Sequence, residues 1–199
     1  LVGSEMCIRD SFLARDMLLR FVSLWKQQTG GNTGQEITKN AQIEMLDFKY
    51  KKCVGIRSYS PVPKIDKNKI LEAAELINNA KNALIVWGQG VILGNAEKEF
   101  KNFVEKSGIP AAWTILGASA IPTSHELNVG MVGMHGNYGP NILTNKCDLL
   151  IAIGMRFDDR VTGDTSTYAK QAKIIHLEID PAEVNKNIKV DVPVVGNCK

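Results

Sequence analysis

The charged residues of this sequence with the most evident chemical potential follow directly on an apolar run. Residues 148–153 read Asp-Leu-Leu-Ile-Ala-Ile and predict a buried strand, and residues 154–163 read Gly-Met-Arg-Phe-Asp-Asp-Arg-Val-Thr-Gly. In an open α/β sheet, ligands bind at the carboxyl ends of the strands. Arginine at such a position offers a planar fork of donors suited to phosphate or to a flat conjugated ring. The alternative interpretation is a surface loop whose two arginines pair with its two aspartates.

A glycine-rich turn is the second candidate for ligand binding. Gly88-Gln89-Gly90 follows a predicted buried strand at 83–87 and precedes a helix expected from about Asn95 to Lys106. Strand, Gly-x-Gly turn and helix form the first half of a βαβ unit, in which glycines let the backbone approach a ligand closely. The full spacing, Gly-x-Gly-x-x-x-Gly, is one residue longer than the dinucleotide fingerprint. A plain tight turn is therefore an equal alternative.

The third candidate is a long loop predicted from Ile121 to Asn137, which contains Gly-Met-Val-Gly-Met-His-Gly at 130–136. Loops of this length inside a compact domain are commonly functional. His135 has no partner at metal-ligand spacing, because the other two histidines lie in a separate turn and in a strand. A contact to a flat ligand and a plain loop role both stay open for His135.

An acidic residue at the end of a predicted strand is the fourth candidate. Residues 173–181 read Lys-Ile-Ile-His-Leu-Glu-Ile-Asp-Pro, and their alternation predicts a strand that ends near Glu178. A carboxylate at a strand end is a common device for holding the ribose hydroxyls of a dinucleotide. A solvated carboxylate before a turn is the alternative.

The remaining pattern predicts the elements that position these residues. Asp66 is expected to cap a helix from Lys67 to about Lys81. Further strands are expected at 110–114 and 192–197, and a short helix at 138–146. Such alternation of strands and helices predicts an α/β fold, a Rossmann-like parallel sheet with helices on both faces.

Composition excludes several classes of protein. The chain has 199 residues, 44% hydrophobic and 23% charged, with a net charge of +3, and its lysines are scattered rather than clustered. No basic patch of the kind that binds nucleic acid is present, and no apolar run approaches the roughly 18 residues of a membrane span. The four cysteines are far apart, which argues against a disulfide framework and fits a reducing, cytoplasmic compartment.

The pattern divides the chain into three parts. Residues 1–36 differ from the rest, and we expect them to be weakly ordered or non-native. Residues 37–66 are expected to form an extended interdomain linker, because Pro61 and Pro63 disfavour helix. Residues 67–199 are expected to form the α/β domain.

Four motifs carry a family resemblance. The strings at 56–61, 130–136, 154–163 and 176–181 resemble the large, catalytic subunit of acetolactate synthase, also called acetohydroxyacid synthase, a thiamine-diphosphate enzyme. The match runs from about Ile37 to Lys199, roughly four-fifths of the chain. The Arg-Phe-Asp-Asp-Arg string is the specific part, since related thiamine-diphosphate enzymes share the fold but usually not that string.

The resemblance implies the central, FAD-binding domain of a three-domain enzyme. It places Asp159 and Arg160 in the region that lines the substrate channel, and it places no catalytic residue and no metal ligand in this fragment. The family's usual middle glycine is Gln89 here, so that contact could survive only through backbone. By position, the FAD contacts would come from Gly88, Gln89, Gly90, Thr114, Ile115, Val132, Gly133, Met134, His135, Gly154, Met155, Arg156, Phe157, Asp158, Glu178, Ile179, Asn197 and Cys198.

The resemblance also implies the activity of the full-length protein. The family condenses two pyruvates, or pyruvate and 2-ketobutyrate, with loss of carbon dioxide, in branched-chain amino-acid biosynthesis. Thiamine diphosphate and Mg²⁺ bind outside this fragment, which alone is not expected to be active. The expected partners are further large subunits, in a homodimer or tetramer, and a small regulatory subunit.

Two other functions stay open from the residues alone. One is a flavoenzyme domain like that of pyruvate oxidase, in which the flavin turns over. The other is a non-catalytic module that binds NAD or ADP.

One stretch departs from the family. Just before Ile37 the family carries Gly-Arg-Pro-Gly-Pro, whose Arg contacts FAD, whereas residues 30–36 read Gly-Gly-Asn-Thr-Gly-Gln-Glu. We hypothesise a frameshift or a chimeric join upstream of Ile37. The other reading frames of the parent DNA are then expected to encode the missing segment, and its absence from every frame would refute the hypothesis.

Overall fold

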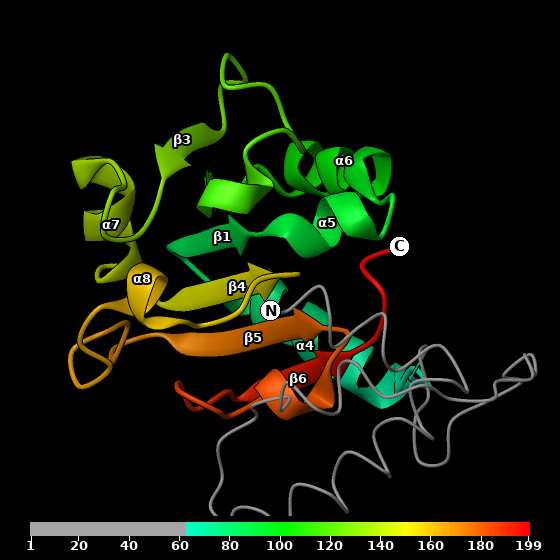
Figure 1. Ribbon diagram of the computed structural model, residues 1–199. Helices are drawn as coiled ribbons and strands as arrows, with labels where there is room; N and C mark the ends of the chain where they lie inside the picture. Colours follow the sequence, from blue (N-terminus) through cyan, green and yellow to red (C-terminus); the bar gives the residue numbers. More distant parts are fainter. Residues whose placement is uncertain (1–62) are drawn as a thin grey trace, which may run out of the picture. The chain divides into compact units, whose positions relative to one another are not determined.

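The computed structural model describes residues 63–199, which contain a six-stranded sheet in the order β3-β2-β1-β4-β5-β6 (Figure 1). Every pair of neighbouring strands is parallel. This is the strand order of doubly wound sheets, in which the order reverses between β1 and β4. The loops that leave these two strands therefore start side by side. The strands are β1 (Ala83–Trp87), β2 (Ala111–Trp113), β3 (Asn128–Met131), β4 (Leu149–Ile153), β5 (Lys173–Glu178) and β6 (Val192–Val195).

The helices begin and end where local chemistry favours it. The predicted cap Asp66 accepts a hydrogen bond from the Asn68 backbone N–H at 2.9 Å, which satisfies one of the free donors of the first turn. At the end of α6, Gly108 adopts the left-handed conformation (φ 66°) that commonly ends helices. The helices are α4 (Lys67–Asn79), α5 (Gln89–Leu93), α6 (Glu97–Ser107), α7 (Tyr138–Thr144) and α8 (Asp159–Thr162), with 3₁₀ turns η1 (Ile115–Gly117) and η2 (Pro181–Glu183).

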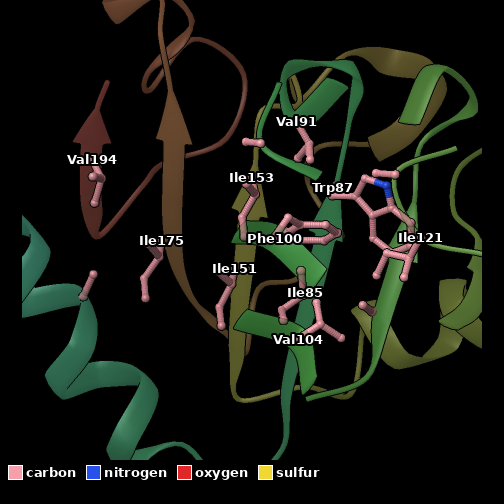
Figure 2. Packing of buried hydrophobic residues seen from close by; sticks show 14 of the residues in the cluster. Ile85, Trp87, Val91, Phe100, Val104, Ile121, Ile151, Ile153, Ile175 and Val194 are labelled. Atoms are coloured by element: carbon pink, nitrogen blue, oxygen red, sulfur yellow. The ribbon is translucent and has the colours of Figure 1, made fainter. Parts of the chain in front are cut away.

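One face of the sheet is covered by α4, α5 and α6 (Figure 2). Trp87 at the end of β1 is fully buried, and its ring centroid lies 5.2 Å from that of Phe100 on α6. The Trp87 indole N–H donates to the Gly117 carbonyl at 2.7 Å, so this large aromatic side chain is buried with its polar group satisfied.

The other face is covered largely by shorter and less regular segments. Its buried cluster joins Leu84, Val86, Leu150 and Ala152 of the sheet to residues from 155–169 and 188–190. Strands buried on both faces explain the continuous apolar runs in the sequence, since neither face of a central strand meets water.

The structure confirms the predicted fold class and five predicted strands, with small shifts at the element ends. The helix expected to reach Lys81 ends at Asn79, and the helix expected from Asn95 begins at Glu97. The expectation of one irregular loop from Ile121 to Asn137 was wrong, because β3 lies inside it.

The strand β3 escaped prediction for a physical reason. It is an edge strand that pairs only with β2, and all four of its residues are half-buried, so it lacks an apolar run.

The predictions for residues 1–62 lie outside the described residues. Within the described part of the chain, no helix has the length and apolar character needed to cross a membrane.

Candidate functional site

Two glycine loops touch at the carboxyl ends of β1 and β4. The Gly90 N–H donates to the Gly154 carbonyl at 2.8 Å, and the Gly88 N–H donates to the Ile153 carbonyl at 3.0 Å. A Cβ added to Gly90 would lie 2.6 Å from the Gly154 Cα, and one added to Gly88 would lie 2.6 Å from the Gly154 oxygen. Packing between the two loops therefore requires glycine at 88 and 90. This favours the tight-turn interpretation of these two residues over close approach to a ligand.

The loop after β4 alternates between buried and exposed side chains. Met155 and Phe157 are buried in the core, at 3% and 4% exposure, whereas the Arg156 side chain is 63% exposed. Phe157 packs edge-on against His176, with ring centroids 4.9 Å apart. Met155 and Phe157 can therefore offer a ligand only their backbone, and Arg156 can offer its guanidinium.

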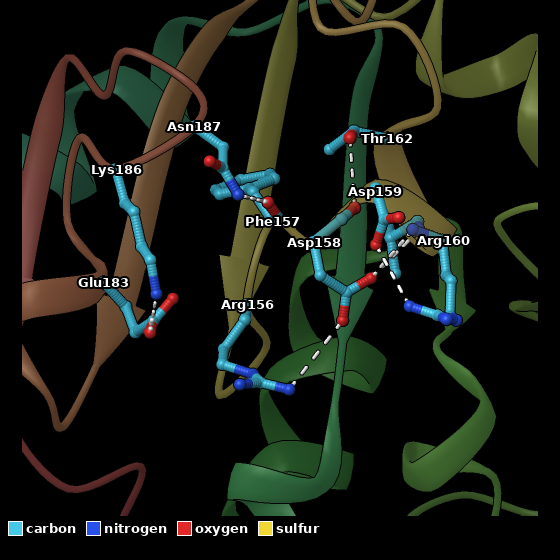
Figure 3. Close-up of polar contacts among 10 residues, drawn as sticks. Arg156, Phe157, Asp158, Asp159, Arg160, Thr162, Glu183, Lys186 and Asn187 are labelled. Carbon is cyan, nitrogen blue, oxygen red and sulfur yellow. Dashed lines mark hydrogen bonds and ion pairs between the residues drawn. The ribbon is translucent and has the colours of Figure 1, made fainter. Parts of the chain in front are cut away.

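The two carboxylates of this loop, Asp158 and Asp159, make different contacts (Figure 3). Asp158 caps α8, where it accepts the backbone N–H groups of Arg160 at 3.1 Å and Val161 at 3.2 Å. The exposed Asp159 lies 3.2 Å from Arg160 in a surface ion pair. Asp158 is also paired at 4.0 Å with Arg156. Pairing between the arginines and aspartates thus occurs, but such exposed pairs are worth only about 0–1 kcal/mol and leave the guanidinium groups accessible.

Two side chains from the next segments hold the backbone of this loop. The Nε2 of His176 on β5 lies 2.8 Å from the Met155 carbonyl oxygen. The Asn187 amide donates to the Phe157 carbonyl at 2.6 Å, as Figure 3 shows. Neither His176 nor Asn187 was predicted from the sequence to have a role in the site. No pattern could have found them, because each contact joins residues more than 20 positions apart.

His176 is buried in its neutral form. Burial lowers its pKa below the usual value, and the hydrogen bond with the Met155 carbonyl opposes that shift only in part. Because a carbonyl can only accept, Nε2 carries the proton and Nδ1 is the acceptor. Nδ1 is buried and has no hydrogen-bond partner within residues 63–199.

Glu178 ends β5 with a buried carboxylate. Burial raises its pKa, while the backbone N–H groups of Asp180 and Ile179, which donate to Oε1, favour the charged form. Oε2 lies 3.9 Å from His176 Nε2 and accepts no hydrogen bond within residues 63–199. This oxygen is therefore available to a hydroxyl donor.

The loop after β3 is fixed between two helices. The Met134 N–H donates to the Arg160 carbonyl at 2.7 Å, and the Asn141 amide on α7 bonds both the N–H and the carbonyl of Gly133. The side chain of Met134 is 68% exposed, and His135 is exposed beside it. Both side chains are free to meet a ligand.

The other predicted contacts lie at the same edge. Thr114 is buried after β2, and Ile115 beside it is 68% exposed. Beyond β6, Asn197 packs against Gly94 at the end of α5, and Figure 1 shows the C-terminus beside that helix. Burial, followed by the charge of Glu178, raises the pKa of the Cys198 thiol to about 11.

The strand ends thus bring together the segments that the sequence selected. Val132 lies buried after β3, Gln89 is exposed at the start of α5, and Ile179 is 45% exposed after β5. In the described residues, no three His, Cys, Asp or Glu side chains form a group that could hold a metal ion.

Replacing Gly90 with alanine is expected to destabilise the protein by about 1–3 kcal/mol, because the added Cβ meets backbone that cannot rotate away. Gly139 on α7 is the matched control, since a Cβ there meets nothing within 4 Å. Gly139→Ala is expected to be neutral or to stabilise by up to about 1 kcal/mol. Urea unfolding of the two variants measures the difference, and equal midpoints would contradict the loop contact.

The lowered pKa of His176 predicts loss of stability in mild acid. The unfolded chain binds a proton at His176 at higher pH than the folded one, so this contribution is full above about pH 6.5 and falls as the pH decreases. The raised pKa of Glu178 acts in the opposite direction, its contribution falling as the pH rises through the acid range. Unfolding free energies of wild type and His176→Gln, measured between about pH 5 and pH 8, separate the contribution of His176 from that of Glu178. Equal pH slopes for both proteins would rule out His176 as the source.

Comparison with known proteins identifies the domain. Residues 70–199 match the family described as thiamine pyrophosphate enzyme, central domain. The chain is 44% identical over 164 residues to the acetolactate synthase large subunit of Corynebacterium glutamicum, an alignment that covers 82% of this chain and 26% of the relative. It is 40% identical over 161 residues to the probable acetolactate synthase large subunit of Methanocaldococcus jannaschii, covering 81% and 27%.

A third relative aligns with nearly the whole chain. The acetolactate synthase large subunit of Buchnera aphidicola subsp. Schizaphis graminum is 37% identical over 204 residues, covering 98% of this chain and 36% of the relative. The chain therefore spans about a quarter to a third of the length of these curated relatives. Its fold and its matched region show that the chain belongs to the thiamine pyrophosphate enzyme family, of which it carries the central domain.

Proposed function

We propose that this chain is the FAD-binding part of an acetolactate synthase large subunit. The similarity to acetolactate synthases from three organisms supports the enzyme class. The Arg-Phe-Asp-Asp-Arg string at 156–160 supports it further, because a generic nucleotide-binding module has no reason to keep it.

The observation that carries the FAD proposal is the meeting of the candidate segments at one edge of the sheet. From Glu178 on β5 to Met134 after β3 the sheet has four strand-to-strand steps. At about 4.8 Å per step this is roughly 19 Å, a span suited to an extended dinucleotide rather than to a mononucleotide. The order reversal between β1 and β4, where doubly wound sheets bind such ligands, lies in the middle.

The residues present fit the chemical groups of FAD. The free Oε2 of Glu178 suits the ribose hydroxyls, and the exposed Arg156 guanidinium suits the pyrophosphate. Ile115 and Met134 present exposed apolar surface suited to a flat ring. Met155 and Phe157 would contribute backbone contacts alone, since their side chains are in the core.

In this proposal the domain holds a cofactor and does not itself perform the reaction. Bound FAD would supply a flat ring that undergoes no net redox change, while thiamine diphosphate elsewhere in the full-length enzyme would supply the electron sink for joining two 2-ketoacids. Asp159 and Arg160 are 78% and 76% exposed, and we place them beside the substrate channel. There the Arg160 guanidinium would attract the carboxylate of pyruvate or 2-ketobutyrate.

The proposals for the whole protein rest on the relatives. They are use of thiamine diphosphate and Mg²⁺, assembly as a homodimer or tetramer, association with a small regulatory subunit, and a cytoplasmic location. The names of the relatives support a large subunit, and therefore an assembly with other chains.

The test is to purify the full-length protein that contains this chain and to record its visible spectrum and its products from pyruvate. We expect a bound flavin that stays oxidised, and acetolactate formed only when thiamine diphosphate and Mg²⁺ are added. Flavin reduced by pyruvate would instead indicate an enzyme like pyruvate oxidase. Binding of NAD or ADP with neither flavin nor product would leave a non-catalytic nucleotide-binding module.

A further inference from the structure

The loop that carries Met134 and His135 is closed at its base by Asn137. The Asn137 N–H donates to the Met131 carbonyl at 2.7 Å, and the Asn137 side-chain oxygen accepts the Met131 N–H at 3.0 Å. Within the loop, the Gly136 N–H donates to the Gly133 carbonyl at 2.9 Å. These bonds set the size of the loop, but none of them ties its tip to α7.

Asn141 on α7 supplies that tie. Its Oδ1 accepts the Gly133 N–H at 2.9 Å, and its Nδ2 donates to the Gly133 carbonyl at 3.0 Å. One half-buried side chain thus bonds both backbone polar groups of Gly133. This arrangement requires a donor and an acceptor on the same short side chain, which an asparagine amide offers.

The position of Gly133 determines the position of its neighbours. Gly133 has a φ of +100°, and a Cβ there would lie 2.5 Å from the Arg160 carbonyl oxygen. The same oxygen accepts the Met134 N–H at 2.7 Å. Asn141 therefore holds a glycine that is wedged against α8, and through it sets where the exposed Met134 and His135 side chains stand relative to Arg160.

We infer that Asn141 is a positioning residue for the flavin site, acting through Gly133 on Met134 and His135; this rests on the proposed function. Asn141 itself need not touch the cofactor. Its amide keeps the loop in the one position in which Met134 is bonded to α8, so the loop does not have to be ordered when the cofactor binds.

The experiment titrates FAD into the cofactor-depleted, full-length protein and compares wild type with Asn141→Ala, Asn141→Asp and the control Asn102→Ala. Asn102 is exposed on α6, a helix that supplies none of the candidate site residues. We expect both Asn141 variants to weaken FAD binding about tenfold or more. Asn141→Ala loses both hydrogen bonds to Gly133. Asn141→Asp keeps the bond from the Gly133 N–H, but its second oxygen repels the Gly133 carbonyl. Asn102→Ala is expected to bind like wild type.

Asn141→Asp provides a readout that a merely structural role would not move. An ionised Asp has no donor for the Gly133 carbonyl, whereas a protonated one regains an O–H donor beside an acceptor oxygen. Its FAD affinity, relative to wild type at each pH, is therefore expected to recover as the pH is lowered from about 7 to about 5, toward the range in which a half-buried Asp facing a carbonyl takes up a proton, and to fall again on return. The comparison with wild type at each pH removes any pH effect that the two proteins share.

The outcomes are distinct. Wild-type-like FAD affinity in both Asn141 variants would overturn the inference. So would weakened binding that follows a lowered melting temperature and shows no recovery in Asn141→Asp, because Asn141 would then serve stability alone. If Asn141→Ala does not fold, the reversible pH series on one folded sample of Asn141→Asp decides. A wild-type protein that binds no FAD would overturn the proposed function, and this inference with it.

Discussion

The arrangement of the loops at the carboxyl ends of the strands, here called the carboxyl edge, depends on the close contact between Gly154 and the turn at Gly88 and Gly90. Where the strand order reverses, the loops leaving β1 and β4 start from adjacent strands and compete for the same space. Here they share it, with a backbone hydrogen bond of 2.8 Å and no room for a Cβ on either side. Gly154 has a φ of +58°, a conformation that glycine adopts at little cost. This contact sets the direction in which α5 and the Arg-Phe-Asp-Asp-Arg segment leave the sheet.

The rest of the edge follows from how those loops are held. Hydrogen bonds from side chains outside these loops fix their backbones: His176 holds the Met155 carbonyl, Asn187 holds the Phe157 carbonyl, and Asn141 holds Gly133. Because the backbone is fixed, buried side chains can anchor each loop in the core while their neighbours project outward. The same segment thus serves the core and the candidate site.

The buried and the exposed groups of this edge also differ in their electrostatics. The buried groups, His176 and Glu178, have pKa values shifted toward their neutral forms, since burial penalises charge. The exposed groups of the Arg-Phe-Asp-Asp-Arg segment pair with one another in surface ion pairs, which are weak. The phosphates of a ligand would therefore meet accessible guanidinium groups on the outside of the edge, and its hydroxyl groups would meet a carboxylate oxygen in the buried part. This combination suits a dinucleotide.

The sequence by itself determined the fold class, five of the strands and the Asp66 cap, because apolar runs, caps and turn residues act within a few neighbouring positions. The segments of the candidate site were also selected from the sequence, and their role in binding stays a prediction. The sequence could not determine β3, an edge strand that has no apolar run. Nor could it give the strand order, the requirement for glycine at 88 and 90, or the roles of Asn141 and Asn187. Only the tertiary structure decided these, since each depends on which distant backbone atoms the folded sheet brings within hydrogen-bond or van der Waals distance.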